Sequence, residues 1–152
     1  MTWLFSGLPP ERFQHFFALC DRELKERHVK RLPAGRGVPC RVSLQDAAPG
    51  EPVLLLPFEH HPANSPYRSS GPIFIRQAAR AARVATDVPE SFRGRLYSAR
   101  AYDADGNMVE AEVGEGRELE ALLERVFAQA SAEYVHLHHA RRGCYACRVD
   151  RA

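Results

Sequence analysis

Apolar and polar residues alternate along two pairs of neighbouring segments in the second half of the chain, a pattern typical of half-buried strands. The first pair is residues 95–102 and 107–113, joined by the sequence DADG, whose Asp-Gly pair suits the positive backbone angles of a tight turn. The second pair is residues 134–138 and 145–149, on either side of HARRG. We therefore predict two β-hairpins.

Three further segments have the pattern of strands. The continuous apolar run 52–58 predicts a central strand covered on both faces, and residues 71–76 predict another strand. Residues 38–44, VPCRVSL, alternate and predict a strand with Cys40 facing the core. Between 52–58 and 71–76 lies EHHPANSPYRSSG, a polar loop longer than most connections, and such loops are often functional.

Apolar residues recur at helical spacing in two places. Between the hairpins, a helix is predicted from Glu115 and Glu118 onwards. Its apolar face comprises Leu119, Leu122, Leu123, Val126, Phe127 and Ala130. Near the N-terminus, residues 9–24 predict an amphipathic helical segment that begins with two prolines and is kinked at Asp21, a suitable N-cap.

These elements predict one domain over residues 1–152, of the α+β class. We expect a mostly antiparallel sheet, an N-terminal helical segment, and one long core-packing helix between two C-terminal hairpins. The length of 152 residues is enough for one hydrophobic core that needs no disulfides.

Composition and charge narrow the classes of function. The 21 Lys and Arg residues nearly balance 19 Asp and Glu residues, which predicts no broad basic surface for nucleic acid or for an anionic membrane. No apolar stretch approaches the roughly 18 residues of a membrane-spanning helix, and the N-terminus lacks a basic leader. We expect a cytoplasmic protein without nucleic-acid or membrane partners, its four cysteines reduced.

His136 and His138 offer two imidazoles on one face of a predicted strand, because successive strand side chains point to opposite faces. Cys144 or His139 could supply a third ligand for a divalent metal such as zinc. Three protein ligands would leave a position for water, as in hydrolytic zinc sites. His136 or His138 could instead act as a catalytic acid or base, and both could also face solvent or join a polar layer without further function.

The long loop and the strand after it offer a second candidate site, for a small anionic molecule. Arginines bind carboxylate or phosphate in bidentate fashion, and the hydroxyls and backbone N–H groups of SSG can add hydrogen bonds. The candidate ligand-binding residues are His60, His61, Tyr67, Arg68, Ser69, Ser70 and Arg76. In the alternative interpretation, Tyr67 and Arg68 fix the loop to the body through internal hydrogen bonds.

Two other chemistries are disfavoured. Cys144 and Cys147 have the spacing of a redox pair, but an alternating strand runs through them where a redox pair needs a helix N-terminus, so Cys147 is better interpreted as a core residue. No Gly-x-Ser-x-Gly sequence is present to expose a nucleophilic serine.

Three segments together span most of residues 38–152: PCRVSLQDAAPGEPVLLLPFEHHPANSPYRSSGPIFIR, RAYDADGNMVEAEV and YVHLHHARRGCYACRVDRA. In these segments the chain resembles the DUF1203 family, bacterial proteins of unknown function. The resemblance implies a bacterial cytosolic protein and brings no activity, cofactor or catalytic residue. The family pattern favours asparagine at position 139 and a small residue at 147, which implies that a site common to the family would contain His136, His138 and Cys144.

Two functional hypotheses follow from the sequence. In the first, the protein is an enzyme or a small-ligand-binding protein whose polar His/Arg/Ser pocket takes a small anionic molecule, with or without a metal. In the second, it is a non-catalytic structural or interaction module, such as a homodimer, in which the same residues form a buried polar network. The polar residues gathered on the long loop and the last hairpin favour the first hypothesis.

Overall fold

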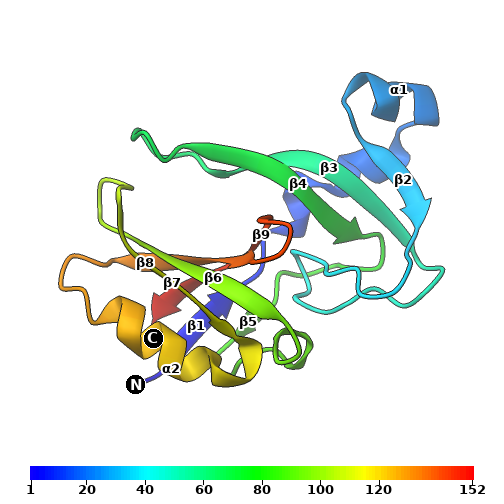
Figure 1. Cartoon of the computed structure of the whole chain (residues 1–152). Coiled ribbons are helices and arrows are strands. Elements are labelled where there is room, and N and C mark those ends of the chain that lie inside the picture. Colours follow the sequence, from blue (N-terminus) through cyan, green and yellow to red (C-terminus); the bar gives the residue numbers. More distant parts are fainter.

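Two antiparallel sheets form the framework of the chain, and the computed structural model describes all residues from Met1 to Ala152 (Figure 1). The larger sheet has six strands in the order β5-β1-β9-β8-β6-β7. Its strands are β1 (Trp3–Ser6), β5 (Val84–Ala85), β6 (Leu96–Tyr102), β7 (Met108–Glu115), β8 (Tyr134–His139) and β9 (Tyr145–Arg151). The smaller sheet has the order β2-β3-β4, with strands β2 (Lys30–Pro33), β3 (Pro52–His61) and β4 (Ser69–Arg76).

One helix covers the face of the six-stranded sheet that points away from the three-stranded sheet (Figure 1). A 3₁₀ turn, Gly116–Glu118, leads into helix α2 (Leu119–Phe127). The apolar face of α2 packs in one core with side chains of β6, β8 and β9, because alternate residues of these strands point towards the helix. The helix-facing strand residues include Tyr97, Ala99, Val135, Leu137 and Cys147.

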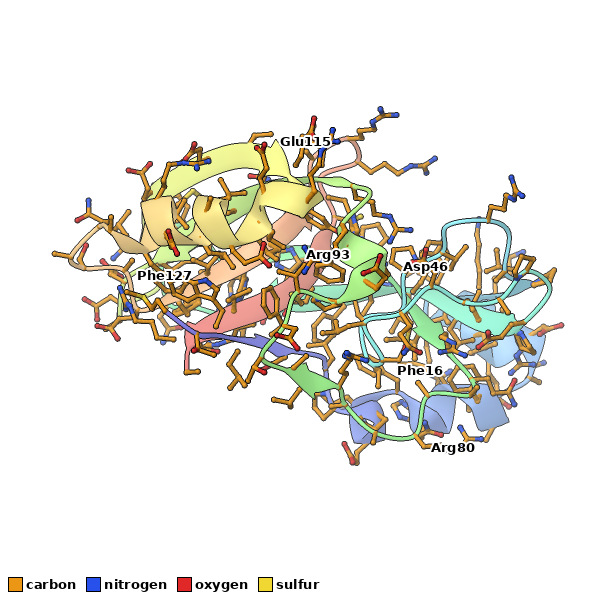
Figure 2. The ribbon with its side chains drawn as sticks, turned by 90° about the horizontal axis from the view of Figure 1, so that it is seen from below. Phe16, Asp46, Arg80, Arg93, Glu115 and Phe127 are labelled. Atoms are coloured by element: carbon orange, nitrogen blue, oxygen red, sulfur yellow. The ribbon has the colours of Figure 1, made fainter.

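A second core lies around the three-stranded sheet and the N-terminal segment. The segment consists of two 3₁₀ turns, Pro10–Arg12 and Gln14–Ala18, and the short helix α1 (Asp21–Glu26). A further 3₁₀ turn, Glu90–Phe92, precedes β6. Figure 2 shows Phe127 and Phe16 far apart, in the regions of the first and the second core respectively. The second core comprises Phe13, Leu24, Val29, Cys40, Val42, Leu54, Leu56, Ile73, Ile75 and Ala79.

The structure confirms the coarse fold and corrects some of its detail. Both predicted hairpins are present, with α2 between them, and the sheets are mostly antiparallel. The helical content is small, so the fold is sheet-rich. The predicted N-terminal helical segment is present only in part, as two 3₁₀ turns and the short helix α1, which begins at Asp21. The strand β1 was not predicted, since four residues followed by Gly7 and a Pro-Pro pair give too short a pattern. None of the helices is long and apolar enough to cross a membrane.

Two predicted segments differ from the structure in ways that matter for the site. Residues 38–44 form turns with isolated bridges at Pro39 and Cys40, and the Leu44 N–H donates a hydrogen bond of 3.1 Å to the carbonyl oxygen of Cys40 that closes the turn. Cys40 is nevertheless buried, as predicted. Strand β3 continues three residues beyond the predicted end, so His60 and His61 lie on a strand instead of in the long loop.

The turn between β6 and β7 packs against the loop between β3 and β4 and so ties the two sheets together. The Ser65 hydroxyl donates a hydrogen bond of 2.8 Å to the carbonyl oxygen of Gly106. Gly106 has a φ of 79°, and a Cβ at this position would overlap the Cβ of Ala63 and lie 3.6 Å from the His61 ring. Glycine is therefore needed here both for its backbone conformation and for the close approach of the loop.

We expect the substitution Gly106→Ala to lower the free energy of unfolding by about 1–3 kcal/mol more than Gly50→Ala. Gly50 has a similar φ of 84° but no atom within 4 Å of its added Cβ, so it isolates the backbone contribution from the contact with Ala63. Urea denaturation of both variants measures the difference. Equal losses would show that the contact with the loop contributes nothing to stability.

Candidate functional site

Three histidine side chains from the two sheets converge at one point. His136 and His138 come from β8, and His60 comes from the end of β3. One ring nitrogen of each histidine lies within 4.8 Å of those of the other two. His136 and His138 are buried, with 4% and 1% of their surface exposed, and His60 is half-buried.

Local structure explains how these side chains meet. Val135 and Leu137 point into the core beneath α2, so the alternate residues His136 and His138 emerge from the opposite face of the sheet, as predicted. His60 is added by β3. The pairing of β3 with β4 is irregular between Phe58 and His61, and such a bulge changes the direction of the side chains at a strand end.

Each of the three imidazoles has a buried ring nitrogen without a hydrogen-bond partner in the protein. These atoms are Nδ1 of His60, Nδ1 of His136 and Nε2 of His138. On His138, Nδ1 lies 2.9 Å from the carbonyl oxygen of Gly143, which can only accept, so Nδ1 carries the proton and Nε2 has a free lone pair. This is the arrangement in which proteins orient a metal-ligating histidine.

Burial keeps the three histidines neutral near pH 7. Desolvation is the largest cause of the lowered pKa of each histidine. The pKa of His60 and that of His138 fall to about 4. Desolvation also lowers the pKa of His136 well below its ordinary value. The neighbouring histidines add to the effect, because a second charge at the same place would be repelled. Neutral imidazole is the form that binds a metal ion.

Aromatic rings hold the imidazoles in place. The Tyr145 ring stacks on His60 with centroids 5.3 Å apart and an interplanar angle of 7°, and it meets His136 edge-on at 5.0 Å. Tyr102 packs edge-on against His136 at 5.4 Å. Since Tyr102 and Tyr145 are themselves buried, the histidine rings have little freedom to turn into solvent.

His61 belongs to a separate network beside the three histidines. Its Nδ1 lies 2.8 Å from the carbonyl oxygen of Tyr67, so Nδ1 is the donor and Nε2 accepts the hydrogen bond of 2.7 Å from the Tyr134 hydroxyl. The Ser69 hydroxyl donates to the same Tyr67 carbonyl at 2.8 Å. These bonds fix the loop after β3 to the last hairpin through the backbone carbonyl of Tyr67. Arg68, which was also expected to fix the loop, instead pairs with Glu59 at the surface.

A cavity of about 690 Å³ opens next to the histidines, within the usual range for small-molecule sites. Its walls come from β3 and the loop after it, the β6–β7 turn, β8, β9 and the end of β1. Among the lining residues are His60, His61, Asn64, Tyr134, His136, Tyr145 and Arg148. The Arg148 guanidinium lies over the Tyr134 ring at 4.2 Å and pairs with Asp150.

Arg100 is the one unneutralised cation beside the histidines. It lies opposite His136 in the pairing of β6 with β8, and its side-chain hydrogen bond goes to the Ser98 hydroxyl at 3.3 Å, with no carboxylate paired to it. Its positive charge contributes, after burial, to the lowered pKa values of His60 and His138.

The predicted third metal ligand, Cys144, lies elsewhere. Its sulfur is 3.2 Å from Nη2 of Arg41, and it does not belong to the group of converging ligand atoms. His139 lines a second cavity together with Cys144, because it points away from His138. His60 takes the place expected for the third ligand. The only feature of the sequence that could have indicated His60 as a metal ligand is its position two residues after the apolar run 52–58, within reach of a longer strand.

The predicted anion-binding residues are brought together only in part. His60 and His61 line the histidine cavity, and His61 and Ser69 both bond the Tyr67 carbonyl, but the two arginines lie elsewhere. Arg76 pairs with Glu51, and Arg68 pairs with Glu59 at 3.4 Å on the surface. Arg76 and Ser69 lie at opposite ends of β4, about 23 Å apart at the rise of an extended strand. Ser70 is exposed, and no hydrogen bond of its side chain is present.

Comparison with known proteins identifies one family. The model of DUF1203, described as a protein of unknown function, matches residues 37–151. That range contains the three histidines, the His61 network and Arg100. No curated protein and no solved structure matches the chain.

The lowered histidine pKa values predict that stability falls on acidification. The folded state resists protonation of His138 down to about pH 4, whereas the unfolded chain takes up this proton near pH 6.5, so stability is full above about pH 6.5 and is lost towards pH 4. We expect His138 to contribute up to about 3 kcal/mol of this loss. Urea denaturation of metal-free protein between pH 7 and pH 4 should show a shallower loss for His138→Gln than for the parent. The exposed His15→Gln variant should match the parent, and identical slopes for all three proteins would refute the assignment.

Proposed function

The chain belongs to the DUF1203 family, and we propose that it binds a divalent transition metal of the zinc class through His60, His136 and His138. The metal would present an open coordination position to a small anion in the adjoining cavity. The observation that carries the proposal is the convergence of three buried, neutral imidazoles, each with a ring nitrogen that has no partner in the protein.

A purely structural role explains these nitrogens less well. A buried polar atom left without a partner costs about 1–3 kcal/mol, and buried networks that only stabilise a fold are normally satisfied throughout. The neighbouring His61 network is satisfied in this way, with both ring nitrogens bonded. Two clusters side by side, one with all its ring nitrogens bonded and one with three ring nitrogens that have no partner, favour ligation at the second.

The donor set indicates the class of metal. Imidazole nitrogen suits zinc, copper, nickel and iron, whereas calcium and magnesium prefer oxygen. Zinc–nitrogen distances of about 2.0–2.1 Å place tetrahedral ligand atoms about 3.4 Å apart. The present separations of up to 4.8 Å require the rings to move together by roughly an ångström, and His138 is already oriented by Gly143.

Charge indicates the class of the second ligand. Three neutral imidazoles leave the metal with its full double positive charge, and Arg100 adds another positive charge without a carboxylate. Buried charges in proteins are normally compensated, so an anion between the metal and Arg100 would neutralise the site. A metal in this position would act as a Lewis acid on an oxygen atom of that ligand.

We expect metal-free protein to bind one Zn²⁺ or Co²⁺ per chain, detected by isothermal titration calorimetry and by the visible absorption of Co²⁺. His60→Ala and His136→Ala should each weaken binding by at least about 100-fold, since even the loss of a supporting residue around a metal costs 10–100-fold. Cys144→Ser and His15→Ala should bind as the parent does. Absence of stoichiometric binding would end the proposal, and a loss in Cys144→Ser equal to that in His60→Ala would show that the ligand set is wrong.

Binding of an anion to the site is measured on the Co²⁺-loaded protein. Inorganic phosphate should change the Co²⁺ absorption spectrum, and Arg100→Gln should raise the phosphate concentration needed by about tenfold or more, because a charged hydrogen bond is worth about 1.5–3 kcal/mol. The exposed Arg22→Gln variant, on α1, serves as the control of equal charge. A spectrum that responds identically in all three proteins would exclude Arg100 as the anion-binding residue.

A further inference from the structure

A second cavity, of about 920 Å³, lies on the other side of the last hairpin and shares no lining residue with the histidine site. It is formed by the turns after β2, the segment before β6, the end of β7 and the β8–β9 turn. Figure 2 shows Arg93 and Asp46 at this junction between the two sheets. Seven of its lining residues are arginines: Arg36, Arg41, Arg93, Arg95, Arg117, Arg141 and Arg142.

Acidic side chains within the protein neutralise only part of this charge. Arg95 makes a bidentate pair with Asp46 at 2.8 and 2.9 Å, Arg93 pairs with Glu120, and Arg117 pairs with Glu115. Glu115 is the sole acidic residue that lines the cavity. Four arginines have no carboxylate partner: Arg36, Arg41, Arg141 and Arg142.

Arg41 is the most informative of the four, because it is only 2% exposed. Its guanidinium donates to the carbonyl oxygens of Tyr145 at 2.7 Å and Pro39 at 2.6 Å, and to the sulfur of Cys144 at 3.2 Å. These partners, two carbonyl oxygens and a sulfur atom, take up three of its five N–H donors and include no carboxylate. A buried arginine stays protonated and is normally paired with an anion, so this one directs positive potential into the cavity.

His139 contributes a ring nitrogen that has no hydrogen-bond partner. Its Nε2 is buried without a partner in the protein. His139 lines the cavity beside Cys144.

We propose that this cavity binds a small polyanion, a molecule with two or more phosphate or carboxylate groups, between the buried Arg41 and the exposed arginines Arg36, Arg141 and Arg142. Four unpaired guanidinium groups at one cavity repel one another and attract a multiply charged ligand more strongly than a singly charged one. Their fork geometry suits bidentate contacts with phosphate and carboxylate. The volume suits a molecule of metabolite size.

The test uses protein that has been freed of metal with a chelator. The chelator is itself a polycarboxylate and would compete for the cavity, so it is removed before the titration. Titration calorimetry at low and at physiological ionic strength measures binding of inorganic pyrophosphate and of citrate, with inorganic phosphate as the comparison. We expect one polyanion per chain, bound at least about tenfold more tightly than phosphate. Preference for pyrophosphate would indicate a phosphorylated ligand, and preference for citrate a polycarboxylate.

A pair of charge-matched variants locates the site. Arg141→Gln combined with Arg142→Gln should weaken binding by at least about tenfold, and since both side chains are exposed and unpaired, this variant should fold normally. Arg22→Gln combined with Arg27→Gln removes the same charge from α1 and should bind as the parent does. His136→Ala should also retain polyanion binding, so the outcome is independent of the metal proposal.

Alkylation provides a second readout. Cys144 lines the cavity, whereas Cys20 is exposed near α1. Saturating pyrophosphate or citrate should slow modification of Cys144 by the uncharged reagent iodoacetamide and leave that of Cys20 unchanged, as measured by peptide mass spectrometry. The proposal is overturned if neither polyanion binds at low ionic strength, or if the two double variants lose affinity equally.

Discussion

The removal of three imidazoles from water is the constraint on which the rest of this structure depends. His60, His136 and His138 lie where two sheets meet, and no carboxylate accompanies them. An imidazole in such surroundings loses its affinity for protons and keeps a free lone pair, because the charged form cannot be solvated. In the proposed site, the same burial that would cost stability in a structural network would prepare the three imidazoles for a metal ion.

The surrounding elements are arranged to maintain this burial. Tyr145 stacks on His60, the carbonyl of Gly143 fixes the His138 ring, and the His61–Tyr134 bond fixes the loop beside the cavity. Gly106 lets the β6–β7 turn approach that loop closely. The Gly143–His138 bond lies within the last hairpin, but the other contacts join one sheet to the other. The geometry of the site and the packing of the two sheets therefore depend on the same interactions.

The alternation of apolar and polar residues was sufficient to predict the part of the site that comes from β8. Alternation placed His136 and His138 on the polar face of a strand and Cys147 in the core, and the structure agrees with these placements. The contribution of His60 could not be predicted, since it depends on a bulge in β3 and on the stacking of one sheet on another, which are tertiary features. Arg41 was missed for a related reason: its segment has the alternation of a strand, but residues 41–43 form a turn that is closed by the hydrogen bond from Leu44 to Cys40.

The terminal segment, from Tyr134 to Asp150, gathers histidines, cysteines and arginines that look like one cluster in the sequence. In the structure they divide between two cavities, because neighbouring residues of an extended chain point in opposite directions. Tyr145 directs its ring onto His60, while Cys144, next to it, contacts Arg41. The division places the converging imidazoles, which suit a cation, beside one cavity, and Arg141 and Arg142, which suit an anion, at the other. Arg148 remains at the histidine cavity, where it is paired with Asp150. Two different electrostatic environments can thus be built from one hairpin.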